Sequence, residues 1–151
     1  MAIVNIGEML RRAMEFERHL ESYYASIRDH SIDNGVRLLT YYLSRHCRHL
    51  EQAIADYGED KVKKIGEIKL KFDFDFHPEK ESTITQLDPK KVKAEELLNA
   101  AIEYDEILVS FYKKILEQPL IPAAAAFIES LIHIEETDVI MQKKIRATHY
   151  F

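Results

Sequence analysis

Two histidines, His46 and His49, stand three residues apart in the stretch SRHCRHLE, on either side of Cys47, the only cysteine of the chain. Imidazole nitrogens and thiolates bind divalent metals, and a thiol is also a redox group. A spacing of three places the two imidazoles close together on one face of a helix. The stretch is therefore a metal site, a redox thiol or the polar face of a helix.

Four carboxylates lie where apolar residues are expected. One predicted helix has an apolar seam with steps of four and three residues, formed by Ala13, Glu17, Leu20, Tyr24 and Ile27. Such a seam is typical of a helix packed in a bundle, so Glu17 points toward the interior. Asp105 has the same place on a second seam, and Glu135 and Asp138 lie on a third. A buried carboxylate costs several kcal/mol unless it is paired, protonated or bound to metal.

These carboxylates and the two histidines form a candidate ligand set for a divalent metal. Its members are Glu17, His46, His49, Asp105, Glu135 and Asp138. Two other interpretations fit the same spacing. Imidazolium rings could balance the carboxylates in a metal-free buried network, or rotated helices could expose some of these groups to solvent.

The helices that would position these groups follow from periodicity and capping residues. We expect helices at about 7–29, 35–57, 89–117 and 122–148. Asn5 with Glu8 resembles a capping box, Gly58 is a stop signal, and Asp88-Pro89 is typical of a helix start. A long connector, 59–87, separates the second helix from the third. Two antiparallel helix pairs joined by a long crossover is the connectivity of ferritin-like bundles. We therefore predict an all-α, single-domain protein over residues 1–151, a ferritin-like four-helix bundle made of two helix hairpins joined by a long crossover that contains one short β-strand.

The chain also repeats itself. Residues 13–27, AMEFERHLESYYASI, align without gaps to residues 101–115, AIEYDEILVSFYKKI, and Glu17 falls opposite Asp105. Identities at both polar and apolar positions favour a duplicated helix hairpin. The alternative is that any two amphipathic helices resemble each other.

With these motifs in place, the chain resembles the rubrerythrin-like branch of the ferritin-like superfamily. In that family the first and third helices carry motifs like Glu-x-x-Ala-x-x-Phe-Tyr, and here they read Glu17-Arg-His-Leu-Glu-Ser-Tyr-Tyr24 and Asp105-Glu-Ile-Leu-Val-Ser-Phe-Tyr112. The second and fourth helices carry Glu-x-x-His, and here they read His46-Cys-Arg-His49 and Glu135-Glu-Thr-Asp138. The resemblance covers most of the chain apart from the connector.

Three positions depart from the family pattern. Asp105 is one methylene shorter than the family's glutamate, and Asp138 replaces a histidine. His46 replaces a glutamate expected to bridge two metals, and a neutral imidazole offers a single lone pair. Only Glu17, His49 and Glu135 keep the family's ligand type. The rearrangement is either compensation within an altered site or drift after a site was lost.

The resemblance implies a metal-binding protein holding iron, manganese or zinc, with a role in redox or oxygen- or peroxide-linked chemistry. Tyr24 and Tyr112 would then donate hydrogen bonds to the ligands. The alternative is a non-catalytic ferritin-like scaffold that has lost its metal. Cys47 has no partner for a dithiol motif, and the cysteines of a rubredoxin-like domain are absent. We expect Cys47 to be structural.

The connector contains one strand signal. Apolar residues alternate through IKLKFDFDF, residues Ile68–Phe76, and no second strand is evident elsewhere. Paired antiparallel with a copy of itself about Phe72, the strand sets Lys69 opposite Asp75 and Lys71 opposite Asp73. Opposite charges favour such pairing, and the arrangement has the two-fold symmetry of a closed dimer. We expect a homodimer through this strand; the alternative is an extended arm lying on its own bundle.

Composition excludes several partners. The net charge is -5, and the one basic cluster, KVKK at 61–64, is surrounded by carboxylates, so we expect no nucleic-acid binding. No apolar run reaches the ~18–20 residues of a membrane span, and the first residues lack a signal-peptide core. A single cysteine cannot form an internal disulfide, which is consistent with a reducing compartment and a cytoplasmic location.

Overall fold

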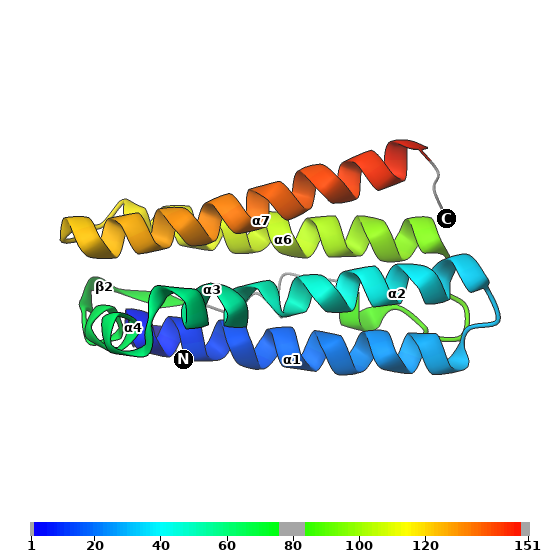
Figure 1. Ribbon diagram of the computed structural model, residues 1–151, viewed down its shortest axis with the longest axis horizontal. Coiled ribbons are helices and arrows are strands. Elements are labelled where there is room, and N and C mark those ends of the chain that lie inside the picture. Colours follow the sequence, from blue (N-terminus) through cyan, green and yellow to red (C-terminus); the bar gives the residue numbers. More distant parts are fainter. Residues whose placement is uncertain (1, 76–83, 149–151) are drawn as a thin grey trace.

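Long helices dominate the computed structural model, which describes residues 2–75 and 84–148 (Figure 1). The elements are β1 (Ala2–Asn5), α1 (Ile6–His30), α2 (Asn34–Cys47), α3 (His49–Tyr57), α4 (Glu59–Gly66), β2 (Lys69–Asp75), the 3₁₀ turn η1 (Ile84–Gln86), α6 (Ala94–Leu116) and α7 (Pro122–Thr148). The prediction of an all-α protein is confirmed. Within the described residues no helix has the length and apolar character that a membrane crossing requires.

The long helices lie side by side. The helix α2 runs back along α1, and α7 runs back along α6 (Figure 1). Contacts between α2 and α6, and between α3 and α7, close the interior from the other side. The core fills the space between these helices, and its largest fully buried side chains include Tyr104, Tyr112 and Phe127. Charged groups at mid-length of these helices are therefore brought close to one another.

Two of the predicted helices have the expected bounds, and a third begins later. The expected helices at 7–29 and 122–148 correspond to α1 and α7. The side chain of Asn5 accepts a hydrogen bond from the Glu8 amide, as the capping prediction requires. Asp88-Pro89 does not start a helix, because Asp88 closes a separate turn by accepting from the amides of residues 90–92. Instead α6 starts at Ala94, and the side chain of Glu96 accepts from the Lys93 amide.

The predicted helix at 35–57 is interrupted at Arg48, between α2 and α3. There the Arg48 amide donates to the Arg45 carbonyl at 3.2 Å, three residues back, which is the tighter 3₁₀ pattern. The sequence does not predict this interruption, because neither glycine nor proline stands at this point. The stop signal at Gly58 is confirmed: its φ of 100° lets the chain turn directly into α4, so part of the expected connector is helical.

The strand prediction is confirmed at Lys69–Asp75, but the expectation that the chain has no second strand is wrong. The short β1 pairs antiparallel with β2, in the register Ala2↔Asp75, Ile3↔Phe74 and Asn5↔Lys69. A strand of four residues that ends on the helix cap Asn5 shows too little alternation to be recognised from sequence. The last residue of the predicted strand, Phe76, lies outside the described residues. Pairing of this strand in a homodimer stays a prediction.

Candidate metal centre

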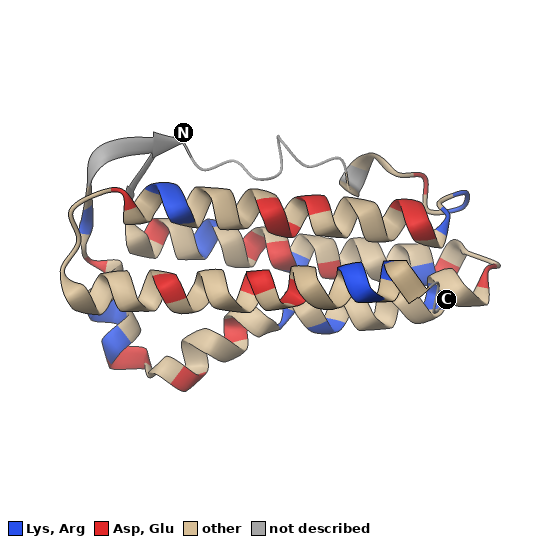
Figure 2. Cartoon of the chain, turned by 90° about the horizontal axis from the view of Figure 1, so that it is seen from above, with Lys and Arg blue, Asp and Glu red and all other residues tan. Residues whose placement is uncertain are grey.

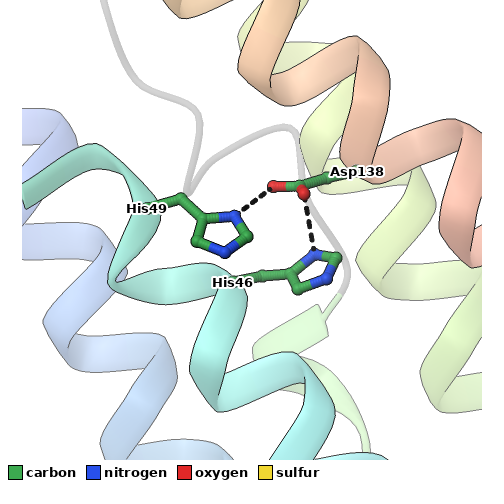
Figure 3. Close-up of side chains that lie close together, drawn as sticks. All are labelled: His46, His49 and Asp138. Atoms are coloured by element: carbon green, nitrogen blue, oxygen red, sulfur yellow. Dashed lines mark hydrogen bonds and ion pairs between the residues drawn. The ribbon is translucent and has the colours of Figure 1, made fainter. Parts of the chain in front are cut away.

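His46 and His49 both face one carboxylate, Asp138, across the interface of α2–α3 with α7 (Figure 3). His49 Nδ1 lies 3.2 Å from Asp138 Oδ2, and His46 Nδ1 lies 3.5 Å from Asp138 Oδ1. One ligand atom from each residue falls within 4.8 Å of the other two. Two imidazoles and a carboxylate are a donor set typical of zinc and of non-haem iron(II).

The break at Arg48 explains how one helical segment presents both imidazoles in the same direction. In a regular α-helix, residues three apart are separated by about 60° around the axis, whereas in a 3₁₀ turn they eclipse each other. The tight turn at Arg48 lies between the two histidines. Their rings stack with centroids 5.0 Å apart and planes inclined by 27°. The local irregularity therefore aligns the two nitrogen donors.

A second group of donors adjoins the first. Asp105 of α6 and Glu135 and Asp138 of α7 also place one oxygen each within 4.8 Å of one another, and all three residues are buried. Asp138 belongs to both groups. Five of the six predicted ligands thus converge, with Asp138 between a nitrogen-rich side and an oxygen-rich side. Figure 2 shows that acidic positions, in red, occur along the middle parts of the long helices.

Glu17, the sixth predicted ligand, is buried but belongs to neither group. It forms a hydrogen bond with the thiol of Cys47. Burial raises the pKa of the Cys47 thiol, and the negative charge of Glu17 raises it further, so the thiol stays protonated. A buried, protonated thiol is chemically inert, which agrees with the structural role predicted for Cys47. A cavity of about 10 Å³ lies beside Glu17, His46 and Asp105, and Tyr24 also lines it. That volume is close to the space of one water molecule.

The four predicted carboxylates are buried, and burial has the largest effect on their pKa values. Within the described residues no lysine or arginine forms an ion pair with the four predicted carboxylates. Burial raises the pKa of Glu17 and of Glu135, and the charge of Asp105 raises both further. The pKa of Asp105 rises to about 8, first through burial and then through the charge of Asp138. Without a cation, the raised pKa keeps a proton on Asp105 at neutral pH, and burial shifts the pKa of Glu17 and of Glu135 in the same direction.

The histidine side of the site has the opposite protonation. The pKa of His46 falls to about 4, because burial and the neighbouring His49 and Arg45 disfavour the imidazolium. Burial raises the pKa of Asp138, and the nearby His49 partly offsets that rise. A neutral imidazole is the form that binds a metal. His46 therefore carries no positive charge that could balance the carboxylates. The metal-free network predicted from sequence required such a charge, so His46 does not support that interpretation.

Three contacting residues were outside the predicted ligand set. Gln142 Nε2 donates to Asp105 Oδ2 at 2.9 Å and lies 3.2 Å from His46 Nδ1. Gln142 lies seven residues after Glu135 on the same helical seam, and this spacing could have predicted that it contacts the site. The Tyr42 ring packs on His46 with centroids 4.4 Å apart. Tyr104 lies beside Glu17, and its hydrogen bond lowers the pKa of that carboxyl. Spacing did not predict this contact, because Tyr104 directly precedes Asp105 and consecutive helical residues point in different directions.

The residues present fit a divalent cation. Besides the two donor groups, the buried Tyr112 hydroxyl and Gln142 Oε1 find no hydrogen-bond partner among the described residues. Unpartnered buried polar atoms are rare in proteins and call for a ligand, an ion or a water molecule. The predicted donation from Tyr112 to a ligand residue is thus absent, although its hydroxyl is buried near Glu135. The buried histidine, aspartate and glutamate groups could hold a metal ion, whose identity they leave open.

Comparison of the chain with protein-family models, curated proteins and solved structures gave no match. The site is therefore interpreted from its own residues.

Proposed function

We propose that this chain is a ferritin-like, rubrerythrin-like metal-binding protein that holds a divalent metal at a rearranged carboxylate and histidine site. One observation carries the proposal. Five of the six residues selected by spacing converge on two donor groups that share Asp138. Buried carboxylates that lack lysine or arginine partners gain most from a bound cation, which replaces their protons.

The arrangement of helices supports the ferritin-like part of the proposal. The pair α1 and α2 packs together, as does the pair α6 and α7. The segment between the pairs includes α4, β2 and η1, so it is far longer than the turn of an up-down bundle. A long crossover between two helix pairs, with ligands on facing helices, is the ferritin-like plan.

Within that plan, Asp138 of α7 would be the carboxylate that the two donor groups share. The resemblance places a bridging glutamate at position 46, where this chain has His46, and an imidazole cannot bridge through a single lone pair. Asp138, at a position where the family has histidine, is the residue shared by both donor groups. Both of its oxygens face imidazoles of the nitrogen-rich side, Oδ1 toward His46 and Oδ2 toward His49, so Asp138 would hold a cation together with these two histidines. In this proposal the two departures from the family pattern compensate each other, rather than mark drift after a site was lost.

Iron, manganese or zinc would fit these donors, and iron or manganese would supply redox chemistry linked to oxygen or peroxide when bound. The protein's own contribution is to orient the donors. Gln142 positions Asp105 through its hydrogen bond, and the Tyr42 ring packs against His46. The low pKa of His46 keeps that imidazole neutral and ready to bind at neutral pH.

Elemental analysis of the purified protein tests the proposal. We expect stoichiometric metal in the wild type and its loss in the double variant His46→Ala, His49→Ala. A matched control, His19→Ala with His30→Ala, removes two histidines of α1 that lie outside both donor groups and should retain the metal. Metal-free wild-type protein that also fails to take up added Fe(II) or Zn(II) would refute the proposal and leave the scaffold without a metal as the better description.

A further inference from the structure

A surface groove of about 350 Å³ runs between α3 and α7 and reaches the metal centre. On α3 its wall follows positions 49, 52, 53 and 56, the repeat of one helix face, and on α7 it follows 133, 134, 137 and 138. Two residues of this wall, His49 and Asp138, are members of the candidate ligand set. The groove therefore leads from solvent to the metal centre.

The exposure of the ligands shows that the centre is open on this side. The His49 side chain is 39% exposed, whereas those of His46 and Asp138 are 11% and 8% exposed. Asp105 and Glu135, on the oxygen-rich side, are buried in the core. Among the described donors of the two groups, His49 is the one that solvent reaches most readily, and a cation arriving through the groove meets it first.

Two further side chains of types that bind metals, a carboxylate and an imidazole, line the groove without belonging to either donor group. Asp56 lies two helical turns beyond His49, roughly 10 Å along the α3 axis, and His133 lies on the facing wall. Gln52 Nε2 donates to Asp56 Oδ1 at 2.8 Å, which orients the carboxylate. Among the residues that the structure describes, no lysine or arginine lines the groove. The local charge therefore attracts cations.

We propose that this groove is the route by which a divalent cation reaches the metal centre, with Asp56 and His133 as a transient capture site. Asp56 and His133 bind the hydrated ion at the surface, and the ion then exchanges these ligands for His49 and Asp138. Exposed groups bind weakly and release readily, as a transfer step requires, while the buried groups retain the ion. This proposal rests on the proposed function, because it names how that same centre acquires its metal.

Metal uptake kinetics test the route. Chelator-treated full-length protein is mixed with Co(II) in a stopped-flow instrument, and the visible absorbance of the protein-bound ion is followed. We expect the double variant Asp56→Asn, His133→Gln to take up Co(II) about tenfold more slowly than the wild type, because local charge raises the association rates of ions. The final amount of bound Co(II) should be unchanged. The slowing should diminish at high salt, which screens the attraction.

A matched control and a second variant make the result specific. Asp29→Asn with His30→Gln makes the same change in charge at two exposed positions at the far end of α1, and it should leave the rate unchanged. Ala53→Phe places bulk in the groove without a change in charge, and it should also slow uptake. Equal rates in the wild type and both groove variants would overturn the route. A lower final stoichiometry in the Asp56 and His133 variant would show a resident site there instead of a transient one. Failure of the wild type to bind Co(II) would instead refute the proposed function and the route together.

Discussion

The helices α1 and α6 contain similar sequences but contribute differently to the candidate metal centre. Over 15 residues at an offset of 88 they are identical at six positions, and both bury an acidic residue at the same seam position, Glu17 and Asp105. Asp105 joins Glu135 and Asp138 and receives a hydrogen bond from Gln142. Glu17 instead bonds to Cys47 and belongs to neither donor group. Equivalent positions thus share burial but differ in chemistry.

The difference comes from the neighbouring helices. The helix α7, packed along α6, supplies Glu135, Asp138 and Gln142, so Asp105 meets other donors. The helix α2, packed along α1, offers Glu17 a thiol. Phe16 and Tyr104 are also equivalent in the repeat, and their rings pack together with centroids 5.0 Å apart. Contact between equivalent residues is expected near a two-fold axis, which supports the hairpin duplication. A duplicated backbone can therefore carry a site that is not symmetric.

The largest expected effect separates Asp105 from Glu17 directly. Asp105→Asn and Glu17→Gln each replace a carboxylate by an amide of the same shape. We expect Asp105→Asn to weaken metal binding by about 100-fold or more, because it removes a donor. Even the loss of a residue that only orients a ligand costs roughly 10–100-fold in affinity. Glu17→Gln should change the affinity by less than about threefold. Competition titration against a chromophoric chelator measures both, and equal losses in the two variants would show that Glu17 is also a ligand.

A second, smaller effect concerns the pH dependence of the metal-free protein. The folded protein holds a proton on Asp105 up to its raised pKa of about 8, while the unfolded chain releases that proton near pH 4. The free energy of unfolding must therefore fall as pH rises through this window, by on the order of 1–2 kcal/mol between pH 6.5 and 8. The pKa of His46 is lowered to about 4, so this group makes the free energy of unfolding rise with pH. Its contribution is confined to the range below about pH 6.5, the ordinary pKa of histidine.

Urea unfolding in the presence of a chelator at pH 6.5 and at pH 8 measures this slope. Asp105→Asn should reduce the slope, because the amide does not titrate. Bound metal should also reduce it, because the cation takes the place of the protons. A slope that is unchanged in Asp105→Asn would mean that this carboxyl is already ionised in the folded protein, contrary to its buried position.

The same contrast explains how far the sequence could be interpreted. Seam positions predicted the burial of Glu17, Asp105, Glu135 and Asp138, because helical spacing determines which face turns inward. Spacing does not determine which side chain on a facing helix is within reach, so the separation of Glu17 from the donor groups was not predicted. That information depends on the crossing of helices distant in sequence.

Local irregularities were equally hidden from the sequence. The 3₁₀ turn at Arg48 aligns the two histidines, but a single tight hydrogen bond has no composition signal. The strand β1 was missed because four residues are too few to show a period of two. Asp88-Pro89 has the composition of a helix start, but its side chain caps a turn that ends before α6. Each of these features depends on which backbone groups find partners in the folded chain.

The smallest expected effect tests whether the α1 side is purely structural. Cys47→Ala removes the hydrogen bond to Glu17 and should lower the free energy of unfolding by about 1 kcal/mol, the usual contribution of such a bond. Metal affinity should stay within about twofold of the wild type, because the protonated thiol lies outside both donor groups. Urea unfolding and the chelator titration provide the two measurements. A loss of affinity comparable to that of Asp105→Asn would make the thiol a ligand, and the two halves of the repeat would then both contribute to the metal centre.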